Sequence, residues 1–310
     1  MAFKTRLYWY ALLGIIIFLG LIPFLAQQFW IVVLSLVFVY IACSEMWSFL
    51  AGHAGLLVLG QQAFLGLGVY TQLIVSEILK WPPWVGVILS PFAGASAAAL
   101  VSLSVKRLRG FFFAFSTLLI SEILYNAFIN WPLVGGAWGK RMEVARFVPS
   151  IVIYYFSAFI AIIACIIVYY IHNSKLGVGV RAVGCDEEAA AELGVNVFRC
   201  KAICLILAGA ITALAGSSYA FQLLFITVAA SFSFEFGISL VFISVIGGVG
   251  TIIGPIIGSL IYVILRSVVL SAHVGLSLIL FGLACIIIIF VAPYGVWGTI
   301  SRKFKLKPYI

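Results

Sequence analysis

Residues 172–201 read HNSKLGVGVRAVGCDEEAAAELGVNVFRCK and form the longest polar interval in an otherwise apolar chain. Asp186 is a good N-cap, because its carboxylate can accept hydrogen bonds from the unpaired N–H groups of a first helical turn. Glu187 and Glu188 follow where the helix dipole favours negative charge. Gly194 can take the left-handed conformation that ends a helix. These residues predict a helix of about two turns, too short to be stable alone, which is either an ordinary loop helix or a docking element.

The composition around this interval is that of a membrane protein. Of 310 residues, 65% are hydrophobic and only 9% are charged, and the mean hydropathy is +1.26, whereas soluble domains carry about 25% charge. A membrane-spanning helix needs about 20 apolar residues, and no alternating barrel pattern is present. The sequence therefore predicts an all-α polytopic membrane protein, with residues 1–310 forming one transmembrane domain of about ten helices.

The predicted spans follow the apolar runs along the chain. An aromatic, glycine-rich loop at 131–146 separates the fifth and sixth spans, and the polar interval 172–201 separates the sixth and seventh. The fourth span ends at a basic cluster, 106–109. The other spans are predicted at 7–25, 29–49, 51–79, 111–130, 147–171, 202–226, 234–246, 252–270 and 274–292.

The distribution of basic residues predicts the orientation. Under the ten-span model, thirteen of the eighteen Lys and Arg residues fall on the side that holds both termini and the interval 172–201. Lys and Arg accumulate on the cytoplasmic side of membranes, so we expect both termini in the cytoplasm and the loop 131–146 outside. The net charge of +9 then reflects orientation and anionic headgroups, and no nucleic-acid partner is expected.

The sequence lacks the usual signs of catalysis and cofactor binding. It has no G-x-x-x-x-G-K-[ST] motif, so the chain itself cannot bind ATP by a P-loop. No clustered Ser/His/Asp set or paired carboxylates suggest an enzyme. The six cysteines are scattered and fit small apolar residues in a reducing setting. We expect no enzymatic activity, no cofactor and no metal site.

Two further features concern a solute pathway. The segment 52–71, GHAGLLVLGQQAFLGLGVYT, contains five glycines and two central amides. Glycines allow close helix packing, but they also interrupt helices that line transporter pathways. Both interpretations stay open, and we predict a helix break or a short tilted helix within 60–68.

Glu122 lies near the middle of a predicted span, with Asn126 four residues later, and Glu45 lies in another span. Charged groups at such positions are expensive and often functional.

Three motifs resemble one family in the expected order. Residues 181–196, RAVGCDEEAAAELGVN, resemble the EAA-type cytoplasmic loop of ABC-importer permeases in the form found in branched-chain amino-acid uptake. Residues 59–70, LGQQAFLGLGVY, are similar to that family's L-G-Q-A-A-F-x-G-I-G-A-Y, with Gln62 in place of a small residue and Val58 just before in place of serine. Residues 247–258, GGVGTIIGPIIG, match its G-G-x-G-T-x-x-G-P-x-x-G pattern, for which we expect a tight turn between packed helices.

The resemblance implies a permease subunit, more like the LivM-type than the LivH-type, in the bacterial or archaeal cytoplasmic (inner) membrane. Its partners would be a homologous second permease, two cytoplasmic ATPase subunits and an extracytoplasmic binding protein. The solute would be a branched-chain amino acid or a similar small polar molecule. An alternative is an ion- or proton-coupled secondary transporter with Glu122 as the coupling carboxylate. Coupling to the ATPase is expected at Asp186, Glu187, Glu188, Ala189, Ala190, Leu193 and Gly194. Ala189, Ala190 and Leu193 are spaced to lie on one side of the helix and face an apolar groove on the ATPase, and Glu187 and Glu188 would meet basic residues at its rim. The translocation pathway is expected at Gly60, Gln61, Gln62, Gly66, Gly68 and Glu122.

Overall fold

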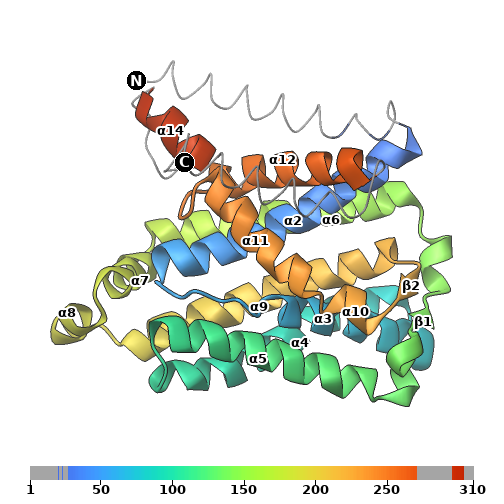
Figure 1. Ribbon diagram of the computed structural model, residues 1–310, viewed down its shortest axis with the longest axis horizontal. Helices are drawn as coiled ribbons and strands as arrows, with labels where there is room; N and C mark the ends of the chain where they lie inside the picture. Colours follow the sequence, from blue (N-terminus) through green and yellow to red (C-terminus); the bar gives the residue numbers. More distant parts are fainter. Residues whose placement is uncertain (1–19, 21–22, 24–26, 271–294, 304–310) are drawn as a thin grey trace.

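The computed structural model describes residues 20, 23, 27–270 and 295–303, and this part of the chain is almost entirely helical (Figure 1). Two short strands pair with each other at one end of the molecule. The main elements are α2 (Gln28–His53), α3 (Gln62–Leu73), η1 (Ile74–Ile78), α4 (Pro83–Ser102), η2 (Leu103–Lys106), α5 (Gly110–Ile129), β1 (Lys140–Arg141), α6 (Ser150–Asn173), α7 (Lys175–Cys185), α8 (Glu187–Glu192), α9 (Val197–Gln222), β2 (Phe225–Ile226), α10 (Val228–Ser231), α11 (Phe234–Gly247), α12 (Ile253–Leu270) and α14 (Gly295–Lys303).

Six helical segments in the described residues are long and apolar enough to cross a membrane. They agree closely with the predicted spans, apart from the fourth, whose start the sequence did not define. The predicted spans 7–25 and 274–292 lie almost entirely outside the described residues, so the count of ten stays a prediction. The six segments are Gln28–His53, Pro83–Val105, Gly110–Ile129, Ser150–Asn173, Val197–Gln222 and Val228–Gly247, and the shorter apolar helix Ile253–Ser267 corresponds to the predicted span at 252–270.

The predicted third span, 51–79, is not one continuous helix. The end of α2 uses its first residues, and residues 54–61 have no regular helical structure. Only then does α3 begin, and it continues into the π-helical turn η1. Apolar composition cannot distinguish one long helix from an extended segment followed by a short helix.

Helix α9 forms the centre of the bundle. It packs against α4, α3 and α2, and glycines allow the closest approaches. A Cβ atom added to Gly68 on α3 would lie 1.9 Å from the carbonyl oxygen of Ala213 on α9, and one added to Gly94 on α4 would lie 2.2 Å from that of Gly209. Small residues at such crossings let helix backbones touch, which is how helices pack where there is no hydrophobic drive between them.

The expected tight turn at 247–258 is present between α11 and α12. Helix α11 ends at Gly247, and Gly248 and Gly250 have φ values of 124° and 78°, which favour glycine. The backbone N–H of Gly250 donates to Ser48 Oγ on α2 at 2.9 Å. The turn therefore holds α11 and α12 together and fixes them to α2.

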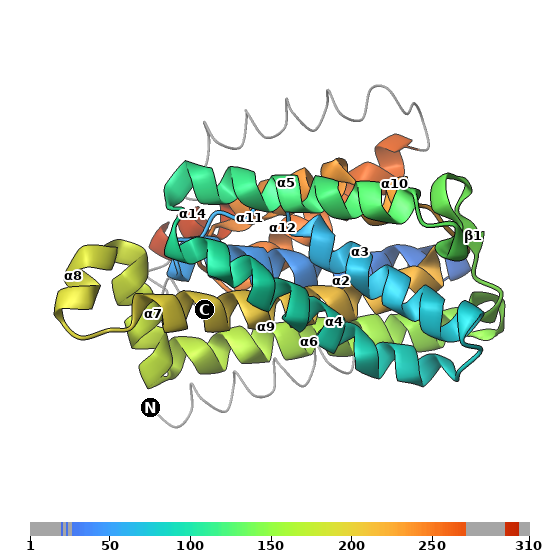
Figure 2. The ribbon, with the colours of Figure 1, turned by 90° about the horizontal axis from the view of Figure 1, so that it is seen from below.

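The two ends of the bundle carry different structures. In Figures 1 and 2, α7 and α8 lie at one end and the strands lie at the other. The strands pair antiparallel, with Lys140 opposite Ile226. The loop 131–146 is fixed to the bundle because Val144 N–H donates to Glu77 Oε1 at 2.9 Å. The two polar loops predicted to face opposite sides of the membrane thus lie at opposite ends of the helices.

Candidate functional site

Helix α8 forms as its capping residues predict. Asp186 Oδ1 accepts hydrogen bonds from the N–H groups of Glu188 at 2.9 Å and Ala189 at 3.1 Å, which satisfies two of the free donors of the first turn. Gly194 has a φ of 84° and follows the last turn. Its N–H and that of Val195 bond back to the final carbonyls, as in a Schellman cap. The predicted ends of the loop helix are therefore confirmed.

One of the three apolar residues expected on the outer face of α8 lies on its buried side instead. Leu193 is 82% exposed and Ala189 is exposed, whereas Ala190 is only 2% exposed. The expectation that Ala190 faces outward with the other two is wrong for this structure, because α8 packs its inner side on α7 and α9. Ala189 and Leu193, four residues apart, are the pair that shares the outer face.

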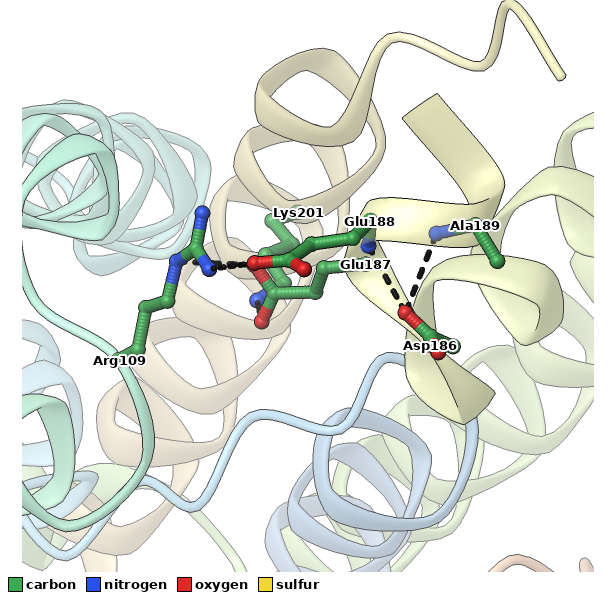
Figure 3. Close-up of polar contacts among 6 residues, drawn as sticks. All are labelled: Arg109, Asp186, Glu187, Glu188, Ala189 and Lys201. Atoms are coloured by element: carbon green, nitrogen blue, oxygen red, sulfur yellow. Dashed lines mark hydrogen bonds and ion pairs between the residues drawn. The ribbon is translucent and has the colours of Figure 1, made fainter. Parts of the chain in front are cut away.

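Acidic residues of α8 form ion pairs within the subunit, as Figure 3 shows. Arg109, just before α5, lies with its Nη1 3.2 Å from Glu188 Oε1 and its Nε 3.7 Å from Glu187 Oε2. Glu187 also pairs with Lys201 on α9. The sequence suggested that both glutamates could meet basic residues on a partner, but in this structure they meet residues of their own chain.

The two sets of pairs differ in burial and therefore in strength. The Lys201 side chain is 4% exposed, so without Glu187 its ammonium group would be left buried and unpaired, which is costly. The side chains of Arg109 and Glu188 are 67% and 82% exposed, and such pairs contribute at most about 1 kcal/mol. Lys201 thus fixes α8 to α9, while Arg109 connects it more weakly to the start of α5. Neither cation was predicted as a site residue, because Arg109 is distant from α8 in the sequence and nothing in the polar interval indicates that Lys201 pairs with Glu187.

A second contact region joins α7 and the end of α6, at His172, to the end of α2. His53 Nε2 lies 3.0 Å from His172 Nδ1, and Arg181 Nη1 donates to the carbonyl oxygen of His172 at 2.7 Å. A Cβ atom added to Gly184 would lie 2.2 Å from the carbonyl oxygen of His53. The backbones of α7 and α2 are therefore in direct contact at the point where α2 ends.

The predicted helix break exists, but it lies earlier than expected. It covers residues 54–61, and Gly66 and Gly68 lie inside the regular helix α3. The backbone N–H groups of Leu59 and Gly60 both donate to Thr117 Oγ1 on α5, at 3.1 and 3.3 Å. The position of the break depends on this distant side chain, which local sequence does not reveal.

The predicted pathway residues of this segment lie inside the subunit. Gln61 Nε2 donates to the carbonyl oxygen of Cys43 and to Thr212 Oγ1, both at 2.9 Å. Gln62 is 1% exposed, and a Cβ atom added to Gly66 would lie 2.4 Å from the ring of Phe232. Their burial means that these side chains do not face a second permease in this structure, and their role in a pathway stays a prediction.

Gly60 differs from the others because it also lines an open groove. The groove runs between α3, α4 and α5, has a volume of about 260 Å³ and is almost entirely apolar. Thr117 and Leu124 of α5 line its other side. Gly60, near the end of the break, therefore lies beside α5 in the lining of this groove.

Helix α5 carries a polar stripe on its exposed side. Glu122 and Asn126 within α5 and Asn130 at its C-cap are all exposed in this single subunit and lie at intervals of four residues. Asn126 Nδ2 donates to the carbonyl oxygen of Glu122, and Asn130 Nδ2 to that of Asn126, both at 2.8 Å. A carboxylate on the lipid-facing side of a membrane-spanning helix is costly, so this side of α5 is a candidate for a polar environment. Glu45, by contrast, is 1% exposed within α2.

These features define a polytopic α-helical membrane protein with a capped helix at one end and a polar face on one span. Residues 29–291 match the family model described as branched-chain amino acid transport system / permease component, and the chain belongs to this family.

Among similar proteins is the high-affinity branched-chain amino acid transport system permease protein LivM of Escherichia coli, 24% identical over 92% of this chain and 74% of the relative. The LivM protein of Salmonella typhimurium is 25% identical over the same shares. The probable branched-chain amino acid transport permease protein LivH of Methanocaldococcus jannaschii is 27% identical over 49% of this chain and 50% of that protein. No solved structure matches the chain.

Proposed function

We propose that the chain is a permease subunit of an ABC importer for branched-chain amino acids or similar small polar solutes. It would work with a homologous second permease, two cytoplasmic ATPase subunits and an extracytoplasmic binding protein. The observation that carries the proposal is α8. In a chain of this permease family, a capped two-turn helix presents Leu193, 82% exposed, at one end of the molecule. An exposed apolar side chain on a short, well-anchored helix fits an apolar pocket on a partner.

We further propose that α5 faces the translocation pathway. Glu122, Asn126 and Asn130 form a polar side on a membrane-spanning helix, and a water-filled path at the interface with the second permease would remove the cost of exposing them to lipid. Gly60 lines the groove beside α5. Gln61, Gln62, Gly66 and Gly68 would support this wall of the pathway from inside the subunit.

The proposed function is tested by leucine uptake into proteoliposomes. The chain is purified with the subunits that co-purify with it, reconstituted, and supplied with radiolabelled leucine and the binding protein outside and ATP inside. We expect uptake that requires hydrolysable ATP and is insensitive to a protonophore. Uptake by this chain alone, driven by a proton gradient and lost when Glu122 is changed to glutamine, would instead establish the secondary-transporter alternative.

The orientation is tested by cysteine labelling. In a background without native cysteines, Lys175→Cys on α7 and Lys140→Cys in β1 place single thiols at opposite ends of the bundle. Under the ten-span model, the excess of Lys and Arg on the side that holds the interval 172–201 supports a cytoplasmic position for that end. We therefore expect an impermeant maleimide to label position 140 in intact cells and position 175 only in inverted vesicles. Labelling of position 175 in intact cells would contradict the proposed orientation, including cytoplasmic termini.

A further inference from the structure

The non-helical segment 54–61 lies between α7 and α8, which we call the α7–α8 unit, and the proposed pathway helix α5. At its first end, Gly55 has a φ of 64°, and a Cβ atom added there would lie 3.3 Å from Gly184 Cα on α7. On the α7 side, Gly184 itself approaches the carbonyl oxygen of His53. Backbone therefore touches backbone at this end, with no flexible side chain between the two elements.

At its other end, the segment is bound to α5 through Thr117. A hydroxyl group has one donor and two acceptor positions, and Thr117 uses all three. It donates to the carbonyl oxygen of Ala114 at 2.7 Å and accepts from the N–H groups of Leu59 and Gly60. Thr117 is 3% exposed, so these bonds are largely shielded from water.

The middle of the segment is also held in place. Trp47 Nε1 on α2 donates to the carbonyl oxygen of Val58 at 2.7 Å, and Leu56 N–H donates to the carbonyl oxygen of Leu50 at 2.9 Å. Leu56 and Val58 are 3% and 1% exposed. The segment is therefore in backbone contact with α7, hydrogen-bonded to α2 at its centre and hydrogen-bonded to α5 at its other end. A shift of α7 and the end of α2 relative to α5 has to carry the segment with it or break its bonds to Thr117.

We infer that residues 54–61 transmit movement of the α7–α8 unit to α5, with Thr117 as the positioning residue at the α5 end. The inference rests on the proposed function, in which α8 docks on an ATPase subunit. A single residue, Asp186, separates α7 from α8, so the two helices move together. Arg109 forms a second connection from α8 to the start of α5. Helix α5 is connected to α8 through Arg109 and to the segment 54–61 through Thr117. Movement of α8 is therefore followed by α5 and by Glu122 on it.

Substitutions of Thr117 separate this role from simple packing. Valine has nearly the same shape but no hydroxyl, so Thr117→Val removes the acceptor of the Leu59 and Gly60 N–H groups, of which Gly60 is buried. Thr117→Ser retains the hydroxyl. The matched control is Ser116→Ala on the same helix, since the Ser116 hydroxyl donates only within α5, to the carbonyl oxygen of Phe113. The reconstituted complex is assayed for leucine uptake and ATP hydrolysis together.

We expect Thr117→Val to reduce uptake by about tenfold while ATP hydrolysis continues, because the bonds that hold the segment to α5 in the coupled state are lost, and an unpaired buried donor weakens such a state by roughly that factor. The ATP consumed per leucine transported therefore rises. Thr117→Ser and Ser116→Ala should retain the parental ratio. Hydrogen–deuterium exchange of the peptide containing Leu59 and Gly60 should become faster in Thr117→Val alone.

The outcomes distinguish failure of this inference from failure of the proposed function. If the parent complex neither hydrolyses ATP nor takes up leucine, the proposed function fails. If the parent is active and Thr117→Val keeps the parental ratio of ATP to leucine, the transmission role is overturned, whatever the exchange rates. A loss shared equally by Thr117→Val and Ser116→Ala would also overturn it, because the effect would then not depend on the connection to the segment.

Discussion

Replacing Leu193 with aspartate is expected to reduce ATP-driven leucine uptake by about a hundredfold, because an anchor side chain at an interface contributes 2 kcal/mol or more and a buried charge adds to the loss. Leu193 is 82% exposed and forms the C-cap of α8. Its removal changes almost nothing inside the subunit, and such surface substitutions alter stability by less than about 0.5 kcal/mol. The measurement is uptake together with binding-protein-stimulated ATP hydrolysis by the reconstituted complex.

The conservative variant Leu193→Met provides the control, since it retains an apolar side chain of similar size and should keep most of the uptake. Glu192→Gln, also exposed on α8, tests whether any change to this helix is harmful and should be nearly neutral. If Leu193→Asp assembles with the ATPase subunits and transports leucine like the parent, α8 is not the docking element, and the proposed function loses its main support.

The ends of α8 could be predicted from sequence because capping is local. Asp186 and the glycine eight residues later supply the hydrogen bonds and the left-handed conformation at the two helix ends, whatever surrounds them. The spans were predictable for a related reason: in lipid, a long apolar run has to form a helix to satisfy its backbone. The short helix and most of the described spans therefore follow from short stretches of sequence.

The remaining features depend on contacts between distant residues. The break at 54–61 is fixed by Trp47 on α2 and Thr117 on α5, so glycine content indicated a break without giving its position. Ala190 turns inward because α7 and α9 lie behind α8, which helix periodicity alone cannot reveal. Lys201 lies in the polar interval with Glu187, yet nothing in the sequence indicates that they pair or that the lysine is buried.

The second prediction concerns the close contact between the broken segment and α5. Gly60→Ala is expected to lower the free energy of unfolding by about 3 kcal/mol, the upper range for overpacking a core, and to reduce leucine uptake in proportion to the loss of folded complex. A Cβ atom at Gly60 would lie 1.9 Å from the carbonyl oxygen of Thr117. The neighbour is helix backbone, so it cannot move aside as the end of a side chain could.

A matched glycine gives this test its control. Gly179 lies within α7, and the atoms nearest to an added Cβ are 3.5 Å away, an ordinary contact distance. Gly179→Ala should therefore be neutral or stabilise the subunit by up to about 1 kcal/mol through helix propensity. Thermal unfolding of the two purified variants measures both effects with the same substitution. Equal stability of Gly60→Ala and the parent would mean that the segment and α5 are not held in backbone contact, and would remove the geometry on which Thr117 depends.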